Sequence, residues 1–265
     1  MTVLLQISDP HFGTEQASVV QALIALAREI RPDLLVLSGD ITQRARPPQF
    51  EAAAEFVRAL GIPHVLAIPG NHDIPLFDLA TRALDPYARY RSAFGDDLEP
   101  RFSAADCLVL CVKTTRRYRH TDGEISDEQR ERIAAELDRA SPEQLRVVVV
   151  HQPVAVPRDS ETHNVAHGSD AAVRRWAESG ADIVLAGHIH LPFVLPLHEH
   201  MAPLPRPLWA VNAGTAVSSR IRYDAGNSVN VLRTSPAEPR VCSVEHWSFR
   251  DPPSAFVRTA TMRLG

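Results

Sequence analysis

Short apolar runs alternate with longer amphipathic segments along most of the chain. The runs are rich in Val, Leu and Ile and end at turn residues, whereas the amphipathic segments are rich in Ala, Glu and Arg. This alternation is typical of an α/β chain. The predicted strands are Val3 to Ser8, Leu34 to Ser38, His64 to Pro69, Arg146 to Val150 and Asp182 to Ala186. The predicted helices are Ala17 to Ile30, Gln49 to Leu60, one that starts at Ser126 with a capping box to Gln129, and Asp170 to Ser179.

The middle and the end of the chain depart from this regular alternation. Leu76 to Phe94 reads as helical with a break at Pro86, and Arg101 to Lys113 reads as a hairpin. After Gly187 the pattern changes to strands alone, and we expect the chain to close with a second, antiparallel sheet. These late strands are Leu191 to Leu197, Leu208 to Val211, Ser228 to Arg233 and Arg240 to Trp247. We predict a single domain over residues 1–250 and leave the structure of the tail, residues 251–265, open.

Composition and charge narrow the class of protein. The 265 residues are 45% hydrophobic and 23% charged, which is ordinary for a soluble globular protein. The formal net charge of -4 gives no overall electrostatic reason to expect nucleic acid as a partner. The longest apolar runs are too short to span a bilayer, and Met1 leads directly into a predicted strand. We therefore expect a cytoplasmic protein that binds neither membranes nor nucleic acid.

Polar side chains that can bind metal follow five of the predicted strands. They are Asp9 and His11, Asp40, Asn71 and His72, His151, and His188 with His190. One His after a strand is most often an ordinary loop residue, and Pro69-Gly70 before Asn71 is ordinary turn chemistry. Ligands of open α/β sheets, however, bind outside the carboxyl ends of parallel strands, so all five loops are expected to converge.

The convergence predicts a metal site because burying these groups together would be costly without a cation. Even without His72, two Asp, one Asn and four His exceed the three or so protein ligands of one catalytic ion, which implies two ions. A carboxylate such as Asp40 can bridge two ions roughly 3.5–4 Å apart, where a shared water becomes a hydroxide near neutral pH. The mixture of imidazole and carboxylate suits iron, manganese or zinc better than calcium or magnesium.

The same residues resemble the signature of the calcineurin-like metallophosphoesterases. The matching blocks, in order and approximate spacing, are Asp9-Pro10-His11, Gly39-Asp40, Gly70-Asn71-His72-Asp73, His151 and Gly187-His188-Ile189-His190. The resemblance implies a four-layer α/β/β/α sandwich of two facing mixed sheets with flanking helices. It also implies that Asp9, His11, Asp40 and His190 hold one ion and that Asp40, Asn71, His151 and His188 hold the other.

The resemblance further implies how such a site acts. His72 would lie beside the phosphate rather than on metal, and would stabilise the transition state or protonate the leaving oxygen. Asn71 would contact the substrate as well as the metal. Asp73 would orient His72. A hydroxide held by the two ions would attack a small phosphoester substrate, with the metals providing the larger electrostatic share.

Weaker motifs point to one branch of that family. Asp122-Gly123-Glu124-Ile125 and Asn212-Ala213-Gly214-Thr215 are similar to segments of the class III cyclic nucleotide phosphodiesterases and glycerophosphodiesterases. Phosphodiesters are therefore the expected substrates. A phosphomonoesterase, a pyrophosphatase acting on a nucleotide-linked lipid, and a scaffold without catalytic activity remain alternatives. His151-Gln152-Pro153 departs from the family, because many members have a second His where Gln152 stands.

Several other polar residues have both a functional and an ordinary interpretation. His163 and His167 lie in a predicted loop, and His163 is the candidate for a substrate contact. The basic run Arg116 to His120 could bring positive charge toward a phosphate, or could simply be a solvated loop. His198 and His200 alternate along a probable strand, so both would share a solvated face that could aid a homodimer contact.

Overall fold

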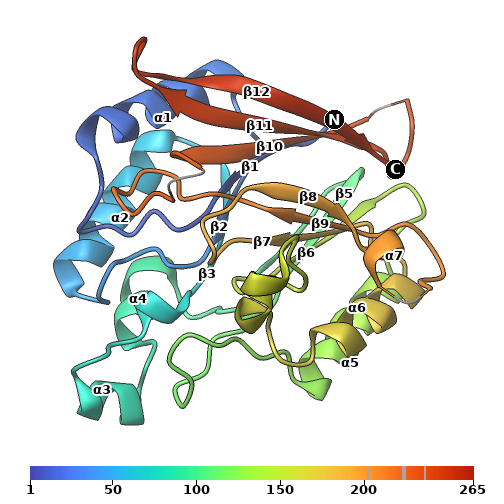
Figure 1. Cartoon of the computed structure of the whole chain (residues 1–265), viewed down its shortest axis with the longest axis horizontal. Coiled ribbons are helices and arrows are strands. Elements are labelled where there is room, and N and C mark those ends of the chain that lie inside the picture. The colour runs from blue at the N-terminus through green and yellow to red at the C-terminus, as the bar shows by residue number, and fades with distance from the viewer. Residues whose placement is uncertain (202, 223–224, 236) are drawn as a thin grey trace.

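Two six-stranded sheets lie face to face at the centre of the protein (Figure 1). The computed structural model describes residues 1–201, 203–222, 225–235 and 237–265. The strands of the first sheet are β1 (Val3–Ile7), β2 (Leu34–Ser38), β3 (His64–Ile68), β10 (Ser228–Thr234), β11 (Cys242–Arg250) and β12 (Ala255–Leu264). Their order is β12-β11-β10-β1-β2-β3, with β1 to β3 parallel and β10 to β12 antiparallel.

The second sheet is also mixed. Its strands are β4 (Arg101–Ser103), β5 (Cys107–Cys111), β6 (Leu145–Val149), β7 (Ile183–Ala186), β8 (Phe193–Pro196) and β9 (Trp209–Asn212). They run in the order β4-β5-β6-β7-β9-β8, where the two outer strands are antiparallel to their neighbours and the inner four are parallel. The β4–β5 pair is the hairpin that the sequence predicts.

Helices cover the outer face of each sheet. The helices, in chain order, are α1 (Ala17–Ile30), α2 (Pro47–Leu60), α3 (Leu79–Leu84), α4 (Ala88–Phe94), α5 (Asp127–Asp138), α6 (Ser169–Glu178) and the single turn α7 (Leu197–His200), and α3 has no buried residue. α1 and α2 lie against the first sheet, and α5 and α6 lie against the second (Figure 1). The capping box predicted at Ser126 is present, since Gln129 N donates to Ser126 Oγ. The resulting layers are the predicted α/β/β/α sandwich.

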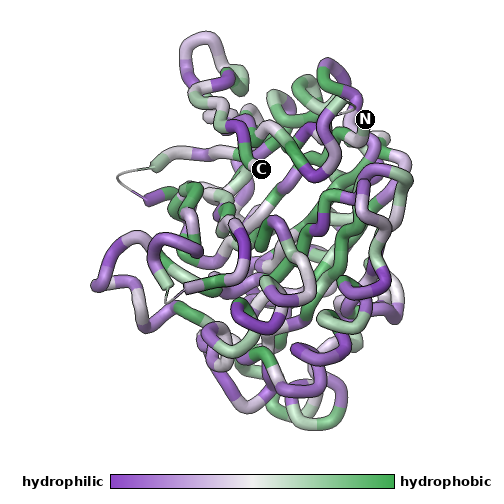
Figure 2. The backbone as a smooth tube through the Cα atoms, turned by 90° about the vertical axis from the view of Figure 1, so that its right-hand side faces the viewer, coloured by the Kyte–Doolittle hydropathy of each residue, from purple (hydrophilic) through white to green (hydrophobic). Residues whose placement is uncertain are grey.

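Strand residues alternate between two hydrophobic cores, as the period of two requires. In β1 and β2, Leu4 and Val36 face the second sheet, whereas Leu5 and Leu35 face α1 and α2. Every residue of these two strands is buried, which explains why their sequences are nearly continuous apolar runs. Figure 2 shows hydrophobic segments concentrated inside the molecule, while the outer loops are largely hydrophilic.

Two expectations about the later part of the chain need correction. The late strands do not form a sheet of their own, because β8 and β9 extend the second sheet and β10 to β12 extend the first. His198 and His200 lie in the helical turn α7 rather than on a strand, and His198 stacks edge-on against Trp209. The tail, whose structure the sequence left open, forms the edge strand β12, ten residues long. None of the described helices is long and apolar enough to cross a membrane.

Candidate metal centre

All five loops with metal-capable side chains meet at the carboxyl ends of the parallel strands. The loop after β1 brings Asp9 and His11, and the loop after β2 brings Asp40. The short 3-10 helix η1 (Asn71–Asp73) follows β3, His151 follows β6, and His188 and His190 follow β7. The parallel strands of both sheets therefore contribute to one place, as the sequence predicts.

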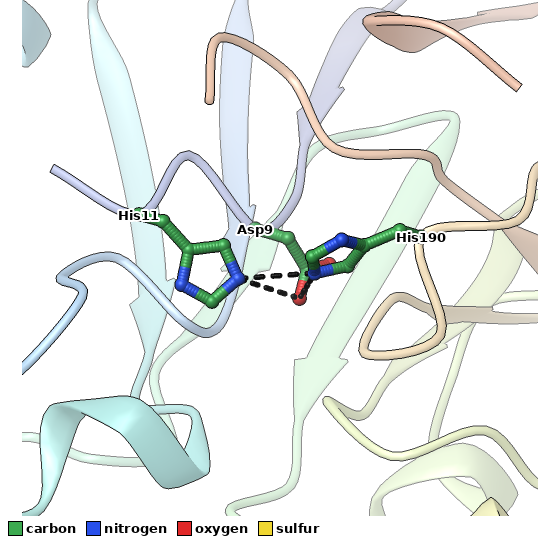
Figure 3. A group of neighbouring side chains, drawn as sticks. All are labelled: Asp9, His11 and His190. Atoms are coloured by element: carbon green, nitrogen blue, oxygen red, sulfur yellow. Dashed lines mark hydrogen bonds and ion pairs between the residues drawn. The ribbon is translucent and has the colours of Figure 1, made fainter. Parts of the chain in front are cut away.

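Ligand-capable atoms of these residues form three overlapping groups, in each of which they lie within 4.8 Å of one another. The groups are Asp9, His11 and His190; His11, Asp40 and His72; and Asp40, His151 and His188. Figure 3 shows the first, in which both imidazoles turn toward the Asp9 carboxylate. Asp40 and His11 each belong to two groups, so the three form one continuous cluster.

The backbone is strained where it presents these side chains. Asp9, His11, Asp40, His188 and His190 all have positive φ angles, between 44° and 70°. Residues other than Gly adopt this left-handed conformation rarely, at a cost of about 1–2 kcal/mol each. Asp9 and His11 are two residues apart, as are His188 and His190. In each pair both residues adopt this conformation, and both side chains reach the same cluster. Strain of this kind is typical of functional sites.

Gly187 allows two of the strand ends to approach closely. A Cβ atom on Gly187 would lie 2.5 Å from Asp9 Oδ2 and closer still to Ser8 Oγ. Any larger residue would therefore push the Asp9 carboxylate out of place. The requirement is for space, since Gly187 does not have a positive φ.

Backbone carbonyls fix the orientation of three imidazoles. Nδ1 lies 2.8 Å from Ser38 O in His151, 2.8 Å from Gln43 O in His72 and 2.7 Å from Arg220 O in His190. A carbonyl oxygen only accepts hydrogen bonds, so Nδ1–H is the donor in each case. Nε2 of each neutral ring then has a free lone pair, which is the arrangement found in metal-binding His residues.

These lone pairs face other acceptors. His151 Nε2 lies 3.3 Å from Asp40 Oδ1 and 3.2 Å from Asn71 Oδ1, and His190 Nε2 lies 3.3 Å from Asp9 Oδ1. Asp9 Oδ1, His11 Nδ1 and His188 Nδ1 are buried and find no hydrogen-bond partner among the described residues. Acceptors that face one another in a buried cluster need protons or cations between them. The donor set, with two carboxylates, an amide and imidazoles, fits divalent cations of the iron, manganese or zinc type.

The protonation of the cluster reflects the same conflict. Burial would lower the pKa of His151, but the charge of Asp40 outweighs it and raises that pKa to about 9. Burial lowers the pKa of His11 to about 3 and that of His188 to about 4. Burial would raise the pKa of Asp9, but the His190 charge brings it to about 2. Some of the imidazoles, such as that of His151, therefore carry a proton that a bound cation would displace.

Supporting contacts that the sequence did not reveal hold the two carboxylates. Asp9 Oδ2 accepts hydrogen bonds from Ser8 Oγ and from His188 N, and Thr215 Oγ1 donates to Asp9 O. Asp40 Oδ1 accepts from His72 N at 2.8 Å. Thr215 belongs to the Asn212 to Thr215 segment that resembles the phosphodiesterase branch, which was the only signal for its role.

Comparison with known proteins agrees with this geometry. The family model described as calcineurin-like phosphoesterase matches residues 2–192. The chain belongs to the calcineurin-like phosphoesterase family. Its class of activity is therefore phosphoester hydrolysis, in a fold built around a His and Asp metal-binding cluster.

Relatives of this phosphoesterase include proteins named as phosphodiesterases. A probable cyclic nucleotide phosphodiesterase of Synechococcus sp. is 24% identical over 203 residues, which are 72% of this chain and 74% of that protein. A glycerophosphodiester phosphodiesterase of Enterobacter lignolyticus is 40% identical over 84 residues, 27% of this chain and 29% of that protein. The fold is similar to a dimetal phosphatase from Danio rerio, with a TM-score of 0.69 and 12% identity over 99% of this chain and 98% of that one.

The structure gives Asp73 a different role from the expected one in this phosphoesterase. Its carboxylate accepts hydrogen bonds from the backbone N–H groups of Ile41, Thr42 and Gly70 and from Thr42 Oγ1, at 2.7–3.0 Å. The prediction that Asp73 orients the His72 ring is wrong, since Gln43 O holds that ring. Asp73 instead joins the loops after β2 and β3. Burial and the charge of Asp40 raise its pKa to about 6.

Gln152, where the sequence departs from the family pattern, points away from the cluster. Its side chain is buried, accepts a hydrogen bond from Thr114 Oγ1 and donates one from Nε2 to Thr121 O at 2.9 Å. Gln152 therefore holds the loop between β5 and α5 and does not offer its amide to a substrate.

The remaining candidates lie outside the cluster. His163 is exposed in the 3-10 helix η2 (Asp159–Asn164), and its role in substrate binding stays a prediction. Within the basic run, Arg116 and Arg119 form ion pairs with Glu124 at 3.4 Å and 3.0 Å. His120 differs from them, because it lines a hollow that also contains His72.

Proposed function

We propose that this protein hydrolyses phosphodiesters at a dinuclear metal centre. The observation that carries the proposal is the set of Nε2 lone pairs on His151 and His190 that face the Asp40 and Asp9 carboxylates across 3.3 Å. Asp9, His11, Asp40 and His190 would hold one ion, and Asp40, Asn71, His151 and His188 would hold the other. Asp40 is the shared ligand in this assignment, in keeping with its place in two of the three groups.

The ions, when bound, would place positive charge against the phosphoryl oxygens and lower the pKa of a water molecule. The protein supports this chemistry by fixing its own ligands in advance. The carbonyls of Ser38 and Arg220 hold the His151 and His190 rings, and Ser8 Oγ and His188 N hold Asp9. Ligands held in this way need little rearrangement when charge develops on the substrate.

His72 would act on the substrate rather than on the metals. Its Nδ1–H is engaged by Gln43 O, so Nε2 is the ring nitrogen available to other groups. In the protonated ring, Nε2–H can donate to the leaving alcohol oxygen and transfer its proton as the ester bond breaks. His72 is half-buried and lines a hollow open to solvent, where the leaving group could depart.

We propose diesters rather than monoesters as the substrates because the names of the relatives include cyclic nucleotide and glycerophosphodiester phosphodiesterases. The test is to measure bound metals by mass spectrometry, reload the protein with manganese, iron or zinc, and compare turnover of bis(4-nitrophenyl) phosphate with that of 4-nitrophenyl phosphate. We expect the diester to have the higher kcat/KM. A metal-loaded protein that hydrolyses neither ester would favour a scaffold function, and faster monoester turnover would favour a phosphomonoesterase.

A further inference from the structure

A shallow hollow, open to solvent, lies directly beside the proposed metal centre. Asn71 and His72 form the end nearest the cluster, and Ile74 and Leu76 form an apolar part of its wall. The remaining charged lining consists of Arg44, Arg82 and His120, with no carboxylate among the lining residues. These three basic residues come from three separate segments of the chain, so the fold gathers them here.

Over the part of the chain that the structure describes, the two arginines of this hollow differ from several neighbouring arginines in having no acidic partner. Arg89 pairs with Asp78 at 2.6 Å, Arg91 with Asp85 at 2.5 Å, and Arg119 with Glu124 at 3.0 Å. Within the described residues, Arg44 and Arg82 make no ion pair. Arg44 lies against the Phe77 ring, 5.9 Å from its centroid.

Arg82 is nevertheless held firmly. Its guanidinium donates to Pro75 O at 3.3 Å and to Arg119 O at 2.8 Å, which joins the segment after β3 to the loop after β5. Carbonyl groups satisfy its hydrogen bonds but leave its charge uncompensated. A fixed guanidinium beside an unpaired Arg44 is well suited to bind a carboxylate or a phosphate group.

We propose that this hollow receives a second anionic group of the substrate, carried on the leaving alcohol of the phosphoester. A short apolar spacer between that group and the reacting phosphate would contact Ile74 and Leu76. The inference rests on the proposed function, because it places the leaving group beside His72. It also specifies the substrate class: alcohols with a carboxylate or phosphate are favoured, and alcohols with a quaternary ammonium group are disfavoured by repulsion from Arg44 and Arg82.

Equilibrium binding tests this subsite without requiring turnover. Propylphosphonate and 3-phosphonopropionate have the same phosphonate and a chain of similar length, and only the second adds a carboxylate. We expect the metal-loaded protein to bind 3-phosphonopropionate about fivefold more tightly by calorimetry, since a contact between partly exposed charges gives up to about this factor. If 1,3-propanebisphosphonate binds still more tightly, the natural anion is a phosphate rather than a carboxylate.

Variants connect the preference to the hollow. In the double variant Arg44→Gln/His120→Gln, which alters two exposed residues and leaves Arg82 in place, the preference should fall from about fivefold to about twofold. Arg58→Gln, which removes an exposed charge from α2, should keep it. Equal binding of the two ligands by the unaltered protein, or a preference that the double variant leaves unchanged, would overturn the inference. Protein that shows the preference but hydrolyses no ester would support the subsite and refute only the proposed function.

Discussion

The Nε2 atoms of His11 and His190 face each other across 3.0 Å, although the two residues lie on loops 179 positions apart in the chain. The Nδ1–H of His190 is engaged by Arg220 O, so its neutral ring directs a lone pair toward His11. Both rings are buried. Asp9, His11 and His190 would hold a cation here, and its charge would remove the repulsion between the two rings, which would link metal binding to the stability of the fold.

Removal of the metals should therefore lower the melting temperature. A ligand present at 100 times its Kd stabilises by about 2.7 kcal/mol, which corresponds to roughly 5–10 °C for a chain of this size. Calorimetric scans before and after treatment with a chelator measure the shift, and added manganese or zinc should reverse it. Asp40→Asn should be insensitive to the chelator. An unchanged melting temperature after loss of both metals would contradict the link.

Substitutions at His72 and Asp40 should separate catalysis from metal binding. His72→Ala should lower kcat about 10²–10⁴-fold, the usual contribution of a general acid, while the metal content stays unchanged. Asp40→Asn should lose both activity and metal, because Asp40 is the proposed shared ligand. Metal analysis with steady-state kinetics measures both effects. His72 lies within reach of His11 and Asp40, so loss of an ion from His72→Ala would reassign His72 as a ligand.

Gly187→Ala should disturb the centre through steric overlap alone. The added Cβ would meet Ser8 Oγ and Asp9 Oδ2, and overpacking of this kind costs typically about 1–3 kcal/mol. We expect lower metal content and a lower melting temperature. Gly226→Ala is the matched control, since a Cβ there meets no atom within 4 Å. Equal behaviour of the two variants would show that the Gly187 contact does not constrain Asp9.

Gln152→Ala should affect the loop between β5 and α5 rather than the metals. The change removes the hydrogen bonds to Thr114 and Thr121 and should lower the free energy of unfolding by about 1–3 kcal/mol. Because this loop includes His120, which lines the hollow beside His72, kcat/KM should fall severalfold with the metal content unchanged.

Gln144→Ala provides the comparison for that variant. The Gln144 side chain likewise both donates and accepts hydrogen bonds, to Ser103 Oγ and Ala104 O and from Ser141 N, but it lies at the opposite end of β6 from His151. It should destabilise the protein by a similar amount and leave kcat/KM unchanged. Full activity in Gln152→Ala would mean that the loop does not influence the substrate.

The ionisation of Asp106 should make the free energy of unfolding depend on pH in the acid range. Partial burial opposes its ionisation, but hydrogen bonds from Thr2 and Thr234 outweigh this effect and hold the pKa of Asp106 well below 3.8. A group whose pKa is lowered by folding stabilises the protein above its unfolded pKa, and this contribution is lost as pH falls. Urea unfolding at pH 7 and at pH 3 measures the loss, which should be smaller in Asp106→Asn.

Asp96→Asn is the control for that prediction, because the Asp96 side chain is 97% exposed. It should retain the pH dependence of the unaltered protein. The Asp106 contacts join the turn before β5 of the second sheet to β10 and to the residue before β1 of the first. An equal pH dependence in Asp106→Asn and the unaltered protein would assign the acid sensitivity to other carboxylates.

The alternation of apolar runs and amphipathic segments was sufficient to predict most elements. Strands such as β1, β2 and β6 are buried on both faces, so their sequences are continuous apolar runs that stand out from the helices. Parallel strands also have one chemical consequence that needs no coordinates: their carboxyl ends lie at the same edge. That rule alone predicted that the loops with Asp9, Asp40, Asn71, His151 and His188 meet.

Only the tertiary structure decided the contacts between segments that are distant in sequence. Pairing with β1 places β10 in the first sheet. The sequence patterns of β8 and β9, in the second sheet, and of β10 to β12, in the first, are alike, so local sequence could not assign these strands to a sheet. The partners of Asp73 and Gln152, and the carbonyls of Ser38, Gln43 and Arg220, are likewise set by packing. Side-chain types and spacing thus determined which atoms could bind metal. The three-dimensional packing determined how those atoms are oriented, because hydrogen-bond geometry depends on neighbours that local sequence does not encode.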